Sequence, residues 1–271
     1  MHSSPQSEGE VLSAAEAAEA SYAAENIAPP RRRTRSILSA PGTYLLVGVN
    51  CAVYIWMVLH GVSLTDPTPI QLIHFGANIP VLVLHGEWYR LLTATFVHVG
   101  LIHLLTNMWC LWNLGLLGEP LLGRWGIGAV YLLTGIAGNL LSLGVNVITH
   151  DVISVGAGAS GAVFGIAGIL IVLLSNYKLP IPAFELQRLR KSVIQFAALN
   201  LVIGLATIAM PIIRIDNSAH VGGFLFGLAL GVPLVPEMTR GRARYLGRQK
   251  LTFAGAALFL SLFGYWIAKL R

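Results

Sequence analysis

The sequence predicts an all-α protein that crosses a membrane several times, and three observations support this fold class. Hydrophobic residues make up 55% of the chain and charged residues only 11%, far below the roughly 25% charged residues of an average soluble domain. Seven apolar runs approach the length of about 20 residues that a helix needs to cross a bilayer. Most lysines and arginines fall in the segments on one side of these runs.

Residues 1–36 differ in composition from the rest of the chain. They are rich in Ala, Glu and Ser, carry five acidic residues, and end in two prolines and an arginine cluster. Such a segment buries little apolar surface, so we expect a disordered cytoplasmic tail with a short helix near Val11–Glu25. It lacks the charged-then-apolar order of a secretory signal, and we therefore expect the span after it to be retained.

The rest of the chain is predicted to form a six-helix core, residues 37–236, followed by a basic loop and a seventh transmembrane helix, residues 237–271. Loops between the apolar runs are mostly short, as expected for helices that pack against one another in a bilayer. The seven expected spans are Gly42–His60, Thr95–Leu117, Trp125–Val147, Ala159–Asn176, Ser192–Ile213, Ser218–Val235 and Leu251–Leu270.

One connection, Gly61–Ala94, is much longer than the others. It contains two short apolar stretches, Ile70–Phe75 and Ile79–Leu84. Long loops in compact proteins are usually functional, and short apolar stretches suit the membrane interface. We expect this segment to lie sideways in the outer leaflet.

The basic residues predict the orientation of the chain. With the N-terminus in the cytoplasm, 14 of the 18 lysines and arginines lie on the inner side, as the positive-inside rule requires. Seven spans then place the C-terminus outside the cytoplasm. The net charge of +6 is read as a signal of topology and lipid contact, and no nucleic-acid partner is expected, because no aromatic-interleaved basic module is present. Short loops and compact length favour a bacterial inner membrane.

Ser160 is the first candidate catalytic residue. It lies in the tetrapeptide Gly158-Ala159-Ser160-Gly161, at the outer end of the fourth span, where unpaired backbone N–H groups favour a developing anion. Flanking glycines allow a substrate backbone to come close. Taken alone, such a motif is more often a helix cap or a packing element than a catalytic site.

His220 is the candidate base, because it lies two residues into the sixth span, at a depth similar to that of Ser160. Were the serine absent, a histidine that only hydrogen-bonds a neighbouring backbone would explain this position equally well. Small residues line one face of each helix at about 100° per residue, which predicts that the two helices pack together. These glycine stripes are Gly161, Gly165 and Gly168 in the fourth span, and Gly223, Gly227 and Gly231 in the sixth.

The second span contributes His103 and Asn107, which are four residues apart and project from one helical face. Acyl transfer needs donors directed at the tetrahedral oxyanion, and an imidazole, a carboxamide and the Ser160 N–H would supply them. The alternative is a polar clasp between helices. Asp216, one turn before His220, is better explained as a cap of the sixth span than as a third member of a catalytic triad.

Together these residues resemble the rhomboid family of intramembrane serine proteases, over about Arg90 to Gly231. The resemblance rests on His103-x-x-x-Asn107, on the tetrapeptide around Ser160, and on Ala219-His220 followed by two glycines. It implies that Ser160 is the nucleophile, that His220 is the general base, and that His103, Asn107 and the Ser160 backbone form the oxyanion hole. It implies no cofactor.

The resemblance suggests supporting roles for further residues. Arg90, after Tyr89, would anchor the first outer loop, His98 would support the site or hold water, and Glu119 would tie helix ends together on the cytoplasmic side. Phe164 stands where some members have a tyrosine, and at about 40° from Ser160 around the helix it can stack on His220. The other supporting positions are Gly158, Gly223 and Gly227.

The expected reaction is hydrolysis of a peptide bond near the outer membrane surface through an acyl-enzyme on Ser160. The implied substrates are single-span membrane proteins whose helix unwinds easily near its outer end, and the lipid bilayer is the other expected partner. Access would be lateral, between the second and fifth spans.

Four alternatives remain, and the first is an ordinary structural membrane protein, which would not require three matching motifs. An inactive rhomboid-like adaptor would bind membrane proteins without cutting them, although such relatives lose the serine or the histidine. A small transporter would also have polar residues at membrane depth, but the hydropathy reveals no paired inverted repeat. A metal site from His98 and His103 is disfavoured, because histidines five residues apart do not share a helix face and no carboxylate joins them. We therefore expect no metal.

Overall fold

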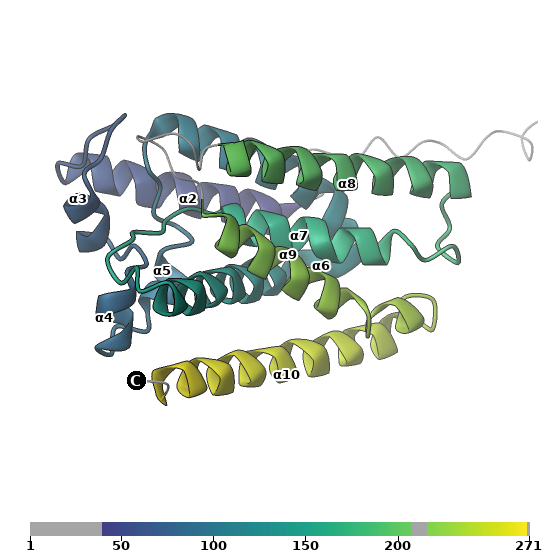
Figure 1. Ribbon diagram of the computed structural model, residues 1–271. Helices are drawn as coiled ribbons and strands as arrows, with labels where there is room; N and C mark the ends of the chain where they lie inside the picture. The colour runs from purple at the N-terminus through teal and green to yellow at the C-terminus, as the bar shows by residue number, and fades with distance from the viewer. Residues whose placement is uncertain (1–39, 207–215, 270–271) are drawn as a thin grey trace, which may run out of the picture. The chain divides into compact units, whose positions relative to one another are not determined.

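The computed structural model describes residues 40–206 and 216–269, and the regular structure in these ranges is helical (Figure 1). Four of the described helices are long and apolar enough to cross a membrane: Pro41–Leu59, Leu101–Ile148, Asn217–Glu237 and Arg242–Lys269. The predicted all-α membrane fold is therefore confirmed, while the number of crossings stays a prediction. The expected tail, residues 1–36, with its helix near Val11–Glu25, lies outside the described residues.

Helix α2 (Pro41–Leu59) begins at a proline, whose fixed φ suits the first turn of a helix. Its free N–H groups are satisfied by Glu119: the amides of Gly42 and Thr43 donate to the two carboxylate oxygens at 2.8 and 2.7 Å, and the Thr43 hydroxyl adds a bond of 2.7 Å. A carboxylate at the positive end of a helix is stabilising. The contact also joins the start of α2 to α6.

The long segment after α2 contains three short helices, α3 (Pro69–His74), α4 (Pro80–Leu84) and α5 (Arg90–Thr93). The two apolar stretches identified in the sequence thus form α3 and α4. Helix α3 starts with a capping box in which Thr68 and Gln71 satisfy each other's backbone N–H groups.

Helix α6 (Leu101–Ile148) consists of two antiparallel arms, residues 101–122 and 124–148, that meet at Gly123. Gly123 has φ 78° and ψ 164°, a conformation that glycine adopts without steric cost. His103 at the start of the first arm lies against Gly158, and Gly138 in the second arm lies against Ala219. Both arms therefore reach the end of the bundle that carries Ser160, and the chain reverses at Gly123.

The remaining helices are α7 (Ser160–Leu173), α8 (Ala183–Ala206), α9 (Asn217–Gly231), the 3₁₀ turn η3 (Val235–Glu237) and α10 (Arg242–Lys269). Three helices begin at other residues than the expected spans do. The first arm of α6 begins at Leu101 instead of Thr95, because Gly100 has a φ of 91° and interrupts the helix. Helices α8 and α10 each begin nine residues before the expected spans, because their first turns are basic and polar, and such residues form helix readily although they are not apolar.

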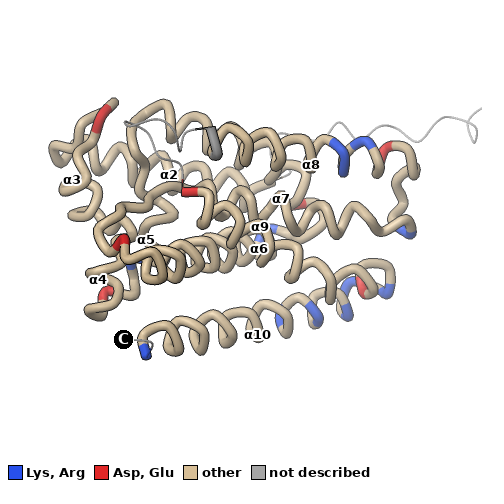
Figure 2. The backbone as a smooth tube through the Cα atoms, viewed as in Figure 1, with Lys and Arg blue, Asp and Glu red and all other residues tan. Residues whose placement is uncertain are grey.

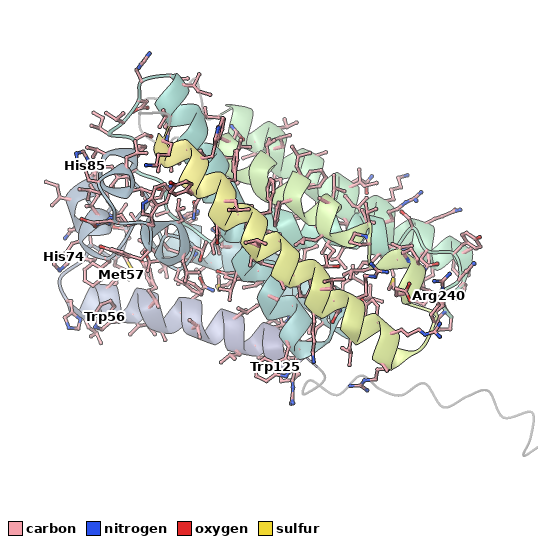
Figure 3. All side chains as sticks on the ribbon, turned by 90° about the horizontal axis from the view of Figure 1, so that it is seen from below. Trp56, Met57, His74, His85, Trp125 and Arg240 are labelled. Atoms are coloured by element: carbon pink, nitrogen blue, oxygen red, sulfur yellow. The ribbon has the colours of Figure 1, made fainter. Side chains whose placement is uncertain are left out.

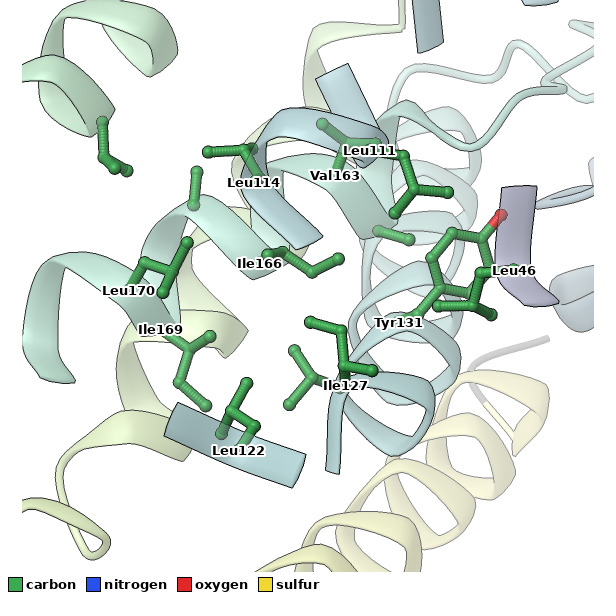
Figure 4. Packing of buried hydrophobic residues seen from close by; sticks show 14 of the residues in the cluster. Leu46, Leu111, Leu114, Leu122, Ile127, Tyr131, Val163, Ile166, Ile169 and Leu170 are labelled. Carbon is green, nitrogen blue, oxygen red and sulfur yellow. The ribbon is translucent and has the colours of Figure 1, made fainter. Parts of the chain in front are cut away.

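Helix α7 lies at the centre of the core and packs against α6 and α9. Every residue from Gly161 to Leu170 is buried. Figure 4 shows Leu114 and Ile127, from the two arms of α6, facing Ile166 and Leu170 of α7. By contrast, α10 uses one narrow face for packing, through Leu260, Gly264 and Ile267.

The two ends of the bundle differ in charge. Figure 2 shows that most of the described lysines and arginines gather at the end where α8 and α10 begin. Trp56, His74 and His85 lie at one end of the bundle, and Trp125 and Arg240 lie toward the other (Figure 3). This uneven distribution of basic residues is the one from which the positive-inside rule predicts an orientation. The orientation of the chain in the membrane stays a prediction.

Replacing Glu119 with Gln should destabilise the fold by about 1–3 kcal/mol, because a buried charged acceptor of three hydrogen bonds is lost. The free energy of unfolding in detergent, measured by denaturant titration, checks this value. Glu185→Gln, at an exposed position in α8, is the matched control and should change little. Equal stability of the two variants would contradict the role given to Glu119.

Candidate active site

Helices α7 and α9 touch backbone to backbone along their glycine stripes. A methyl group added to Gly223 would collide with the Gly161 carbonyl oxygen, and one added to Gly227 would collide with the Gly165 carbonyl oxygen. Gly168 is equally close to the backbone of Phe224. The predicted packing of the two stripes is confirmed, and it fixes the relative height of the two helices.

Ser160 and His220 meet at one end of this contact. The imidazole Nε2 lies 2.7 Å from the Ser160 Oγ, although the two residues are 60 positions apart in the chain. Ser160 is partly exposed while His220 is buried. Because Ser160 is the first residue of α7, its N–H has no partner within the helix.

The His220 ring is held from one side by Phe164. The two rings are stacked, with centroids 4.4 Å apart and an interplanar angle of 13°. Among the described residues, no group hydrogen-bonds the other ring nitrogen, Nδ1. Asp216 accepts from the Ala219 N–H and from the Ser142 hydroxyl, so it caps α9 as the sequence indicated.

The segment before Ser160 is fixed by bonds from the long segment between α2 and α6. Gly156 pairs with Asn78 through two backbone bonds of 2.8 Å. The Gly158 N–H donates to the Ala94 carbonyl at 2.9 Å, and the Ala159 N–H donates to His98 Nε2 at 3.4 Å. His98 is fully buried, and its Nδ1 faces the Phe96 carbonyl at 3.1 Å. The position of Ser160 thus depends on residues far from it in sequence.

His103 lies against Gly158, two residues before the serine. A side chain at Gly158, which has a φ of 132°, would stand 2.5 Å from His103 Cε1. The Val99 N–H donates to His103 Nδ1 at 3.2 Å, so in the neutral ring the proton is on Nε2, the nitrogen beside Gly158. Asn107 is buried, and its amide donates to the His103 carbonyl at 2.9 Å.

Two of the other predicted residues lie away from Ser160. Arg90 is buried in the segment between α2 and α6. It donates to the carbonyls of Ile73 and Ala77 and forms a salt bridge of 2.6 Å with Glu87. The Tyr89 hydroxyl and the Arg90 guanidinium lower the pKa of Glu87, so the carboxylate stays charged. Glu119, which belongs to α6, accepts hydrogen bonds from the backbone at the start of α2. Both residues act on the scaffold.

Sequence reasoning missed several buried polar residues that hydrogen-bond the backbone near the site. The Tyr131 hydroxyl bonds Asn50 and the Thr95 carbonyl, at 3.1 and 2.9 Å, and Asn139 donates to the Leu91 carbonyl at 2.9 Å. Polar groups are costly at membrane depth unless they are paired. Their presence inside apolar runs was the signal that could have identified them.

Metal ligands do not gather in the described part of the chain. No group of three or more His, Cys, Asp or Glu side chains in residues 40–206 and 216–269 is arranged to hold a metal ion. The neighbouring rings of His98 and His103, with centroids 5.4 Å apart, have no third ligand beside them.

Comparison with known families decides the classification. A family model described as the rhomboid domain matches residues 85–237, more than half of the chain, and this match includes Ser160, His220, His103 and Asn107. The chain belongs to the rhomboid family. The matched range begins shortly before α5 and contains the elements from α5 to η3. Helices α2 and α10 lie outside it.

Curated relatives carry the same family name. Rhomboid protease GluP of Bacillus subtilis is 34% identical over 196 residues, which cover 70% of this chain and 35% of the relative. Rhomboid protease AarA of Providencia stuartii is 32% identical over 216 residues, covering 73% of this chain and 74% of the relative. Rhomboid-like protease 2 of Toxoplasma gondii is 30% identical, and the chain spans 62% of its length. The rhomboid chain described here is thus a multi-pass integral membrane protein.

Replacing Gly227 with Ala should destabilise this rhomboid by about 1–3 kcal/mol, because the added methyl forces α7 and α9 apart. Gly48→Ala is the matched control: this glycine also lies inside a helix, but nothing surrounds its Cβ position, so the change should stabilise by about 0.5–1 kcal/mol. Thermal unfolding in detergent compares the two. A Gly227→Ala protein as stable as the Gly48→Ala protein would contradict the backbone contact.

Proposed function

We propose that this protein is an intramembrane serine endopeptidase that cleaves membrane proteins near the outer face of the membrane in which it lies. The observation that carries the proposal is the 2.7 Å contact between Ser160 Oγ and His220 Nε2. A hydroxyl within hydrogen-bond distance of a neutral imidazole is the arrangement that nucleophilic catalysis requires. Membership of the rhomboid family and the protease names of its relatives support the same function.

The first step is attack of Ser160 on the scissile carbonyl carbon. As the C–O bond forms, the hydroxyl proton passes to His220 Nε2, and the carbonyl electrons move onto the oxygen. A correctly placed general base contributes about 10²–10⁴-fold to such a step. The ring of Phe164 stacks on the imidazole and supports it beside the serine without needing a hydroxyl.

The oxyanion is stabilised by donors on two helices. The Ser160 N–H, at the start of α7, has no partner among the residues that the structure describes, and the helix dipole favours negative charge there. His103 offers Nε2–H beside Gly158. The Asn107 amide carries a second N–H hydrogen besides the one bonded to its own helix.

Breakdown of the tetrahedral intermediate returns the proton from His220 to the leaving amine and leaves an acyl-enzyme on Ser160. Water then attacks the ester, with His220 again as base, and the carboxylic acid product leaves. A Ser–His dyad suffices for this sequence, and Asp216, occupied as a helix cap, takes no part.

Substrate class and topology complete the proposal. We expect single-span proteins whose helix unwinds near its outer end, since a fully hydrogen-bonded helix hides its carbonyls from the serine. The N-terminus is taken to be cytoplasmic, with residues 37–236 as the catalytic core and residues 237–271 as an added basic segment and span. A bacterial inner membrane is the proposed location.

Ser160→Ala and His220→Ala should each lower cleavage of a model transmembrane substrate by about 10⁴-fold or more, because nucleophile and base act as one unit. Labelling of the purified protein by a fluorophosphonate probe in detergent should be lost in the same variants. Ser192→Ala, at an exposed position in α8, should behave like the unmodified chain. Absence of labelling in the unmodified protein would favour a non-cleaving adaptor and contradict the proposal.

Asn107→Ala should lower kcat by about 10²–10³-fold with a smaller change in KM, because the lost donor acts on the oxyanion formed after substrate binding. Asn113→Ala is the matched control: its amide makes the same bond to the carbonyl four residues earlier on the same arm of α6, but its side chain is exposed. Steady-state kinetics on a peptide substrate separate the two constants. Equal kcat values for the two variants would rule out this use of Asn107.

A further inference from the structure

A cavity of about 450 Å³ lies between α10, the second arm of α6 and the segment around α5. Its walls are mostly apolar and include Trp88, Leu91, Leu133, Ile136 and Leu260. None of the residues that line it belongs to the candidate active site. The cavity exists because α10 packs through one narrow face only.

The position of the cavity restricts what can fill it. Helix α10 is long and apolar enough to span a membrane, so the cavity faces hydrocarbon. Its volume falls within the range of about 300–1,000 Å³ typical of small-ligand sites. An acyl chain is apolar and flexible, so it matches these walls in chemistry and can follow their shape.

The chemistry at the C-terminal end of α10 suits a lipid phosphate. Tyr265 lines the cavity, and the Lys269 ammonium lies 5.5 Å from the centre of its ring. Both side chains are exposed, so they can reach a headgroup while the helix stays in hydrocarbon. An ammonium and a phenol hydroxyl together form charge-assisted hydrogen bonds to a phosphate. Glu87, the residue before Trp88 of the cavity wall, is paired with Arg90.

We propose that this cavity is a phospholipid-binding site, in which one acyl chain fills the space between α10, α5 and the second arm of α6, and the headgroup phosphate binds Lys269 and Tyr265. The site is independent of the proposed proteolysis. It also touches the scaffold of the active site: the Leu91 carbonyl accepts from Asn139 at 2.9 Å, the Thr95 hydroxyl donates to the Leu92 carbonyl at 2.7 Å, and the Ala94 carbonyl holds the Gly158 N–H at 2.9 Å. A bound chain would therefore steady the segment that positions Ser160.

Photolabelling of the full chain tests the site without any substitution. The protein is reconstituted into phosphatidylcholine vesicles that contain a trace of phosphatidylglycerol with a diazirine in one acyl chain, and labelled peptides are mapped by mass spectrometry. The proposal predicts that label concentrates on peptides of α10, α5 and the second arm of α6. Label spread evenly over all exposed apolar faces, including that of α2, would overturn it, as would cross-links to a second copy of the chain at this cavity.

Two pairs of variants separate the acyl chain from the headgroup. Ala257→Phe fills the cavity, while Leu258→Phe adds a ring to the exposed face of the same helix; labelling should fall about tenfold in the first and stay unchanged in the second. Lys269→Gln should lower labelling about tenfold, whereas Lys250→Gln, at the other end of α10, should not. Unchanged labelling in Ala257→Phe, in a protein that melts normally, would contradict the proposal. Soluble glycerol phosphate should not compete, and competition by it would show a phosphate site without an acyl chain.

Discussion

Helices α7 and α9 approach one another very closely. Carbonyl oxygens of α7 occupy the positions that Cβ atoms would take if Gly223 and Gly227 of α9 had side chains. This contact needs glycine at Gly168, Gly223 and Gly227, and it is made in an environment where packing, and not the exclusion of water, holds helices together. Ser160 and His220 stand where the two helices begin. Their 2.7 Å separation is therefore a property of the helix pair, and any change that widens the contact also separates the two side chains.

A second constraint comes from the long segment between α2 and α6. The backbone before Ser160 belongs to no regular element, so its N–H groups need partners from elsewhere. Asn78, Ala94 and His98 provide them, and these partners are in turn fixed by buried polar contacts such as those of Arg90 and Asn139. The loop thus sets the angle at which the serine enters α7, while the glycines set its distance from the imidazole. Both are needed for one reactive geometry.

Much of this arrangement was predictable, because the residues on one face of a helix recur in the sequence with a period of 3.6 residues. The stripes of small residues, the stacking of Phe164 on His220 and the cap at Asp216 all follow from that period. The starts of α6, α8 and α10 did not follow, since they depend on a positive φ at Gly100 and on polar first turns. The bond between Asn78 and Gly156 was also out of reach, because no periodicity encodes which loops meet.

The rate at which a fluorophosphonate modifies Ser160 in a Gly227→Ala protein tests the central claim most directly. Gly227 lies two helical turns from His220, and in the described structure it contacts Gly165, not the serine. If the backbone contact sets the distance between serine and histidine, modification mapped to Ser160 should slow by about 10²-fold, while Gly48→Ala should leave the rate unchanged. Modification of Ser160 at the unaltered rate in a folded Gly227→Ala protein would contradict the account.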